Sequence, residues 1–280
     1  MTTSHAPVLP GVLGTAAPLA ELLPARRNRP WTVQPAEHQV RRGAPCARLT
    51  DGRRVLWLVD GEAGRLEVFA DRPGLAPLRP DLVEDSGPGA AGVLAGRLLR
   101  ETLPQLDDEQ ARARAEGDAD ALFKARMFDA VDVGFALVDH GAHPDAVNGG
   151  RWAAFSWEAD GGARWALRLH RPQTLSLAYE GPAGGLYGAL ERLLPPGAGR
   201  GPSDAGSAFT RLFTDRFPGL APLDDAEVQW PGRGPLSPGG YIMLPDKEVV
   251  VDRADGRTLV AAEFAPLGVD LLLSAVASLV

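Results

Sequence analysis

Residues 151–194 read RWAAFSWEADGGARWALRLHRPQTLSLAYEGPAGGLYGALERLL, and this stretch decides the fold. Three segments in it, 152–159, 163–170 and 174–181, have the aromatic and aliphatic composition of β-strands. The letters DGG between the first two are typical of a hairpin turn. Residues 184–194 carry leucine and alanine at three-and-four spacing, which predicts a helix. The stretch therefore predicts a strand-turn-strand-strand-helix unit.

Apolar and polar side chains alternate along residues 163–170. The apolar set is Trp165, Leu167 and Leu169, and the polar set is Arg164, Arg168 and His170. Period-two alternation indicates a strand with one buried face and one polar face.

The same plan occurs before and after this stretch. Residues 46–70 read as three strands with a turn at Asp51-Gly52, and an amphipathic helix predicted to stop near Pro104 follows. Residues 240–280 read as strands around a turn at Asp255-Gly256, closed by a helix from Val269. We therefore predict an α+β fold, with antiparallel sheets built from repeated strand-turn-strand-helix units and helices packed on one sheet face.

Along RLEVFA, residues 65–70, Leu66 and Val68 share one face and Arg65, Glu67 and Phe69 share the other, which predicts a sheet with one polar side. A charged helix is expected over 107–130, and the apolar stretch VGFALV, 133–138, is interpreted as a strand that ends in a polar loop. Ser203-Asp204 or Ser207 is expected to cap a helix after a glycine-rich loop.

These patterns suggest four segments. They are a proline- and alanine-rich arm at 1–30, a first unit with the charged helix at 31–130, a second unit at 131–200, and a helix with a third unit at 201–280. The units can pack as one domain or as two.

The composition excludes several classes of protein. A net charge of −7 and a pI near 5.3 oppose binding to the nucleic-acid backbone, so no nucleic-acid partner is expected. A single cysteine, Cys46, leaves no disulfide framework or cysteine-based zinc site and is expected to be a buried spectator.

The start of the chain matches no signal peptide, and the longest apolar run, Leu271 to Val280, is too short to span a bilayer. We expect a cytoplasmic protein with no membrane partner. Heavy use of Ala, Gly, Pro and Arg with only two lysines suggests an actinobacterium-like source.

The segment GPGAAG, 87–92, matches the letters of a dinucleotide-binding loop but follows a polar, proline-led segment instead of a buried strand. No cofactor is therefore expected.

The densest cluster of chemically active residue types is VDHGAHPDAVNGG. Its catalytic candidates are Asp139, His140, His143 and Asp145. Two histidines with two carboxylates can transfer protons or bind a metal, but such residues in a Pro/Gly loop are also typical of a solvated turn. No metal is assigned.

A second candidate set lies on the strand 163–170. Arg164, Arg168 and His170 can cradle an anionic ligand, and the alternative is a solvated sheet face. Trp152 and Trp157 fall on opposite faces of their strand, so one of them, Trp152 in our assignment, is available to a partner.

The repeated sheet-plus-helix layout is similar in outline to the EspG-type chaperones of type VII secretion, which are described as two related halves that bind a helical client. The turn Asp255-Gly256 and the strand end Ala262-Glu263-Phe264 also resemble two-copy domains common in streptomycetes. No residue role is carried over from either resemblance.

Two functions from different classes remain. The repeated units and the lack of a catalytic motif favour a non-catalytic cytoplasmic adaptor or chaperone with a protein or peptide partner. The alternative is an enzyme or accessory protein of specialised metabolism or peptide modification, with a site built from scattered loop residues.

Overall fold

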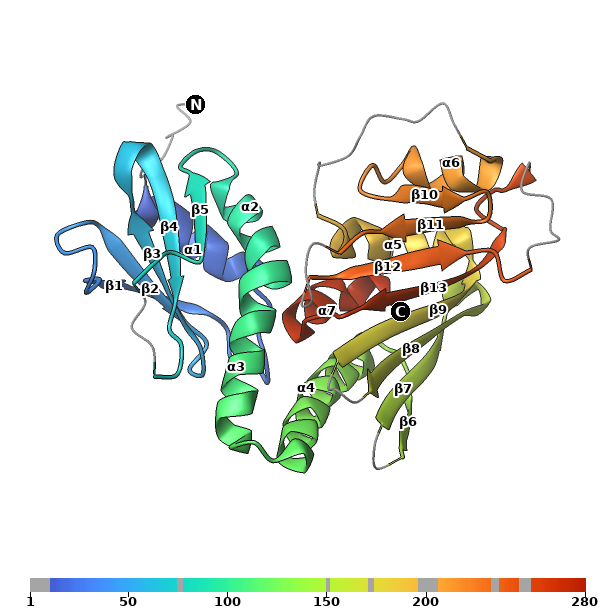
Figure 1. The fold of residues 1–280 in the computed structure, drawn as a ribbon, viewed down its shortest axis with the longest axis horizontal. Helices are drawn as coiled ribbons and strands as arrows, with labels where there is room; N and C mark the ends of the chain where they lie inside the picture. Colours follow the sequence, from blue (N-terminus) through green and yellow to red (C-terminus); the bar gives the residue numbers. More distant parts are fainter. Residues whose placement is uncertain are drawn as a thin grey trace, which may run out of the picture. The chain divides into compact units, whose positions relative to one another are not determined.

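The computed structural model describes residues 11–74, 78–149, 152–170, 174–195, 206–232, 237–246 and 253–280. The chain divides into two compact units, residues 1–110 and 111–280, each with its own antiparallel sheet (Figure 1). The predicted α+β class, with antiparallel sheets, is confirmed.

The sheet of the first unit is a meander in which each strand pairs with the next along the chain. Its strands are β1 (Thr32–Ala36), β2 (Cys46–Thr50), β3 (Val55–Asp60), β4 (Arg65–Ala70) and β5 (Leu82–Asp85). Helices α1 (Val12–Leu22) and α2 (Ala90–Arg97) contact each other, and α1 also contacts β2 and β3. The predicted arm thus contains a helix that is packed against the first sheet.

The turn between β2 and β3 is built around one buried carboxylate. Asp51 Oδ1 accepts the backbone N–H groups of Arg53 at 2.9 Å and Arg54 at 2.7 Å. Asp51 Oδ2 accepts from Arg54 Nε at 2.9 Å and from Nη2 at 2.6 Å. Asp107 lies 3.6 Å from Arg54 and also pairs with Arg26. All four charged side chains are buried, so the turn belongs to the core of the first unit.

The prediction of a polar face along RLEVFA is wrong. Glu67 and Phe69 are buried because the segment between β1 and β2 covers this side of the sheet. Its His38 ring lies 4.3 Å from the Phe69 ring, and its Arg41 donates to Glu67 at 2.8 and 2.9 Å. The first sheet is therefore covered on both faces at β4.

The helix that begins at Ala90 does not stop at Pro104. A π-helical turn, η2 (Leu98–Thr102), joins α2 to α3 (Leu103–Ala115), and the backbone N–H of Leu103 donates to Leu98. Pro104 is the second residue of α3, directly after the wider π-helical turn. At this position the proline ring and the missing backbone N–H of Pro104 are tolerated.

The charged helix expected over 107–130 is in fact the end of one helix and the start of another. Glu116 and Gly117 have positive φ angles and end α3, and Asp118 then caps α4 (Ala119–Asp139). The interpretation of VGFALV as a strand is wrong, because Val133 and Leu137 are one helical turn apart and both are buried inside α4.

The second unit holds an eight-stranded sheet in the order β10-β11-β12-β13-β9-β8-β7-β6, with every neighbouring pair antiparallel. Its strands are β6 (Asp145–Asn148), β7 (Trp152–Ala159), β8 (Ala163–His170), β9 (Thr174–Pro182), β10 (Ala221–Asp224), β11 (Glu227–Trp230), β12 (Gly239–Met243) and β13 (Leu259–Ala265). The strands predicted for the second and third repeats therefore form one continuous sheet. Residues 247–252 (KEVVVD), which fall within the strands predicted over 240–280, lie outside the described residues.

The helices of the second unit share one face of this sheet. They are α4, α5 (Ala183–Leu193), α6 (Ala208–Thr214), α7 (Val269–Ala275) and the short turn η5 (Val276–Ser278). The Trp165 ring lies 6.5 Å from Trp157 and 4.5 Å from Tyr179, which anchors the core at β7–β9. The Ser207 side chain accepts a hydrogen bond from the backbone N–H of Thr210 and so caps α6. Ser207 was one of the two caps expected from the sequence.

The structural boundary at 110/111 differs from the predicted boundaries at 30, 130 and 200. Independent folding of the predicted segments stays a prediction. Across the described ranges, no helix has both the length and the apolar character needed to cross a bilayer.

Candidate functional site

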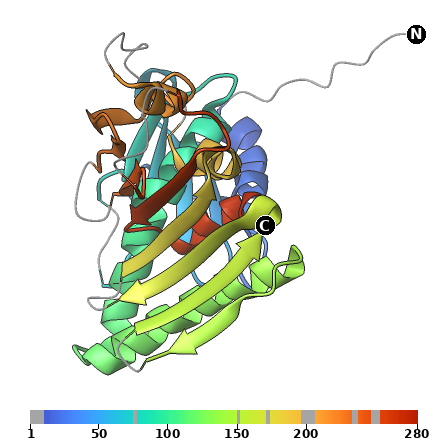
Figure 2. The same cartoon turned by 90° about the vertical axis from the view of Figure 1, so that its right-hand side faces the viewer.

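The eight-stranded sheet has one face that none of the described helices covers, and we call it the open face. Helix-side contacts come from alternate residues: Phe155 lies against Gly134 of α4, and Trp157 Nε1 donates to the carbonyl of Leu279 at 2.7 Å. Residues of the opposite parity, such as Trp152 and Arg168, therefore lie on the open face. Figure 2 looks onto this side, where β6–β9 lie in front of helix α7.

The outer edge of the open face is apolar. Trp152 is 42 % exposed and Val147 is 51 % exposed, although large apolar side chains are usually buried. Val147 pairs with Ala154, two residues from Trp152, so the two side chains are near neighbours. The indole of Trp152 lies over Gly149, where an added Cβ would be 2.3 Å from Nε1. The glycine therefore lets the indole lie flat over the β6–β7 turn.

Small side chains line the middle of the open face. Ser156, Ala166 and Ala178 sit opposite one another across β7, β8 and β9. A row of such side chains leaves the backbone of the sheet accessible between the larger residues around it.

A polar centre adjoins this row. Arg168 on β8 is half-buried and sits directly opposite Ser176 on β9. The Ser176 side chain is buried, and its Oγ has no hydrogen-bond partner in the described part of the chain. No carboxylate among the described residues lies within ion-pair distance of Arg168, although most half-buried charges are paired. Two donors with unused capacity therefore lie side by side.

Tyr241 on β12 and Glu263 on β13 complete the centre. They are paired across the strands, and Tyr241 Oη donates to Glu263 Oε2 at 3.3 Å. Burial raises the pKa of Tyr241, Glu263 and Glu227 raise it further, and the positive charge of Arg168 opposes them. The phenol is therefore a donor at neutral pH, and Arg168 is close enough to act on it electrostatically.

A pocket of about 590 Å³ lies at the edge of the sheet beside the end of β7, and residues from both faces of that strand line it. Its lining includes His143, Asp145, Ser156, Glu158 and Arg164. β6 begins at Asp145, opposite Ser156, so the next residues of β7 have no partner on that side. Arg164 lies 3.5 Å from Glu158, and both side chains are exposed, so this pair contributes little stability.

No protein-family profile, curated protein or solved structure matches this chain.

The four catalytic candidates do not converge. His143 and Asp145 line the same pocket, whereas Asp139 is the last residue of α4 and His140 is its C-cap, with the ring Nδ1 2.8 Å from the Ala136 carbonyl oxygen. The cluster was interpreted as following a strand, but it follows a helix, and its first two members are not among the residues that line the pocket. Among the described residues, no group of three histidine, cysteine or carboxylate side chains is placed to hold a metal ion.

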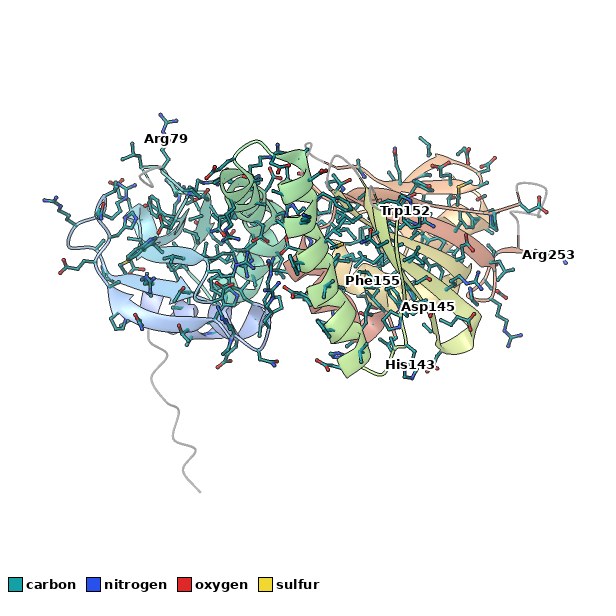
Figure 3. All side chains as sticks on the ribbon, turned by 90° about the horizontal axis from the view of Figure 1, so that it is seen from below. Arg79, His143, Asp145, Trp152, Phe155 and Arg253 are labelled. Atoms are coloured by element: carbon teal, nitrogen blue, oxygen red, sulfur yellow. The ribbon has the colours of Figure 1, made fainter. Side chains whose placement is uncertain are left out.

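The ligand-binding candidates are spread along the open face. Arg164 lies at the pocket, Arg168 at the polar centre and Trp152 at the far edge; Figure 3 shows His143 and Asp145 toward one end of β6 and β7 and Trp152 toward the other. The side chain of His170 lies outside the described residues. Sequence reasoning missed Ser176, Tyr241 and Glu263, because they come from strands that are paired only in the folded sheet.

Proposed function

We propose that this chain is a non-catalytic, cytoplasmic protein-binding protein of the adaptor or chaperone kind, and that it holds its partner on the open face. The observation that carries the proposal is the half-buried guanidinium of Arg168 at the polar centre, which lacks a carboxylate partner in the described structure. A carboxylate of a partner protein would accept charge-assisted hydrogen bonds from Arg168. The neighbouring Ser176 hydroxyl is buried and closed to solvent, so it lines the site without reaching the partner.

The surroundings of Arg168 support a macromolecular partner. Arginine, tryptophan and tyrosine supply most of the binding energy in protein interfaces, and the open face presents Arg168, Trp152 and Tyr241. From Trp152 to Glu158 the face extends roughly 20 Å along β7, at about 3.3 Å per residue. That length suits several residues of a bound segment.

A first experiment locates the partner. A photo-crosslinking amino acid is placed at Trp152 or at Tyr241 in the protein expressed in its source cell, with the exposed Leu13 of α1 as the control position. We expect the same protein to be crosslinked from both open-face positions and not from Leu13. No crosslinked protein at either position, or the same products from all three, would contradict the proposal.

A second experiment measures affinity for that partner. Arg168→Ala removes charge-assisted hydrogen bonds worth roughly 1.5–3 kcal/mol, so binding should weaken by about tenfold or more. Arg164→Ala is the matched control, because Arg164 lies on the same face and strand but is exposed beside Glu158. Equal effects of the two substitutions would argue against a role of the polar centre.

The pocket supports the alternative of an enzyme, because it brings His143 and Asp145 together with Ser156. This alternative predicts that a small molecule copurifies with the protein and is lost in His143→Ala. Such a result, without crosslinks on the open face, would replace the binding proposal.

A further inference from the structure

Helix α4 carries a second apolar surface, on the side away from the sheet. Phe128 is 58 % exposed, Phe135 67 % and Val138 51 %, and Val131 between them is half-buried. We call these four residues the α4 stripe. The other side of the same helix is already occupied by buried residues that pack within the second unit, namely Leu122, Phe123, Ala130, Val133 and Leu137. The stripe is therefore additional to what the fold of the second unit needs.

The spacing of the stripe is three, four and three residues, the pattern of the contact positions in a helix–helix seam. At 1.5 Å per residue it covers about 15 Å of α4. Alternating three-and-four spacing gives the helix a continuous apolar stripe, and another helix of similar periodicity can match it along its whole length. A second helix is therefore a partner that this surface fits.

The ends of the stripe carry opposite charges. Lys124 lies one helical turn before Phe128, on the same side and exposed, and Asp139 lies just after Val138 at the end of α4. The last turn of α3 packs beside Ala121 and Ala125, around the helix from Lys124. Neither Lys124 nor Asp139 forms an ion pair within the described part of the chain.

This arrangement is self-complementary in one orientation. When two copies of α4 run antiparallel about the middle of the stripe, Phe128 faces Val138 of the second copy and Val131 faces its Phe135. Lys124 then lies about 4–5 Å along the axis from Asp139 of the second copy, within reach of its long side chain. Its charge also meets the negative end of the second copy's helix dipole. A parallel pair would place lysine against lysine and carboxylate against carboxylate.

We propose that the chain forms a two-fold symmetric dimer in which the α4 stripe of one copy packs antiparallel on the α4 stripe of the other. The interface is isologous, since the same residues serve both copies. The stripe is a different surface from the open face. The dimer and the proposed binding function can therefore be tested independently, and one can be refuted without the other.

The first test is sedimentation equilibrium of the purified full chain over a hundredfold range of concentration. We expect the mass to rise from 29.6 kDa toward twice that value. Phe135→Asp should remain monomeric at every concentration, because it places a carboxylate in the middle of the seam. The matched control is Leu223→Asp, since Leu223 is 56 % exposed on β10, and this variant should dimerise like the wild type. Circular dichroism confirms that both variants are folded.

The second test determines the orientation. Lys124→Glu and Asp139→Lys each create a like-charge contact across the antiparallel seam, so each should weaken dimerisation at least fivefold. The double variant restores the opposite charges with their positions exchanged and should recover most of the affinity. Each single substitution is compatible with the dipole of α4, because it places a negative charge near the N-terminal end or a positive charge at the C-terminal end. A weaker dimer would therefore not be explained by loss of the helix.

A wild-type protein that is monomeric throughout would overturn the proposal, and so would a dimer that persists in Phe135→Asp. A monomer whose stripe is crosslinked to another part of the chain or to a different protein would assign that occupant instead. Failure of the charge exchange to restore the dimer would overturn the antiparallel arrangement.

Discussion

Replacement of Asp51 should destabilise the first unit far more than replacement of an equivalent turn aspartate in the second. The Asp51 side chain is 3 % exposed and accepts two backbone and two guanidinium N–H groups, while Arg54 is 1 % exposed and stacks 5.0 Å from the Trp31 ring. Truncating one partner of a buried ion pair costs about 3–5 kcal/mol, because the other charge is left in the interior. Asp107 at 3.6 Å offsets part of that cost, so we expect Asp51→Ala to lose about 3–4 kcal/mol of unfolding free energy.

Asp51→Asn separates the two roles of the carboxylate. The amide oxygen can still accept the backbone N–H groups of the turn, whereas the charge that faces Arg54 is gone. Because hydrogen bonds to charged groups contribute about 1.5–3 kcal/mol, the loss should lie in that range and below that of Asp51→Ala. The control is Asp255→Ala, since Asp255 holds a similar turn through the N–H of Arg257 but is exposed, and its loss should stay under about 1 kcal/mol.

The pH dependence gives a second measure of the same interaction. Burial alone would raise the pKa of Asp51, but the charge of Arg54 and the N–H groups of Arg54 and Arg53 outweigh it and lower the pKa below 3.8. The stability that ionised Asp51 contributes is therefore fully present above pH 3.8 and is lost as the pH falls through the lower folded-state pKa. The gap between wild type and Asp51→Asn should stay constant from pH 7 to 5 and narrow below about pH 4.

Hydrogen exchange of peptides covering 46–60, followed with increasing urea, reports on the first unit alone. Two results would refute the reasoning. One is an unfolding free energy of Asp51→Asn that lies within 1 kcal/mol of both the wild type and Asp51→Ala. The other is an equal loss of unfolding free energy in Asp51→Ala and Asp255→Ala.

The remaining predictions concern single positions. Burial raises the pKa of the Cys46 thiol to about 11, so a thiol reagent at pH 8 should modify the protein only after denaturation, and rapid labelling of the folded protein would contradict this. Gly92→Ala should raise the unfolding free energy by about 0.5–1 kcal/mol, because an added Cβ in α2 meets nothing within 4 Å. Gly240→Ala should destabilise by more than 2 kcal/mol, roughly the cost of overpacking, since its Cβ would lie 2.3 Å from the Glu263 carbonyl oxygen. Trp165→Ala should cost about 3–5 kcal/mol in urea unfolding, as expected for a fully buried aromatic.

Five of the described strands were not predicted from the sequence, and four of them, β1, β5, β6 and β10, are edge strands; the fifth, β11, is the neighbour of the edge strand β10. All five have five residues or fewer. Pro35 and Pro222 lie within two of them, and proline is tolerated at an edge because one side of the strand needs no hydrogen bond. A short edge segment is a strand only because its neighbour offers a ladder, so its own residues carry little signal.

The candidate site shows the same limit. Alternation along β8 was enough to place Arg164 and Arg168 on one predicted face. It gave no sign that Arg168 would meet Ser176 and lie near Tyr241, because those residues are brought together by the pairing of β8, β9, β13 and β12. The histidine cluster failed for a related reason: VGFALV fits a strand by composition, and only its packing inside α4 shows that it is helical.

The sequence by itself determined the central strands, the turns at Asp51, Asp160 and Asp255, and the helices that close the repeats. These features depend on the period of apolar residues and on local turn chemistry, which neighbouring residues encode. Tertiary structure alone decided the joining of two predicted repeats into one sheet, the covering of Phe69, and the exposure of the open face and the α4 stripe. Each of these depends on which distant segment removes water from a surface, and the burial pattern of a single strand or helix does not specify that segment.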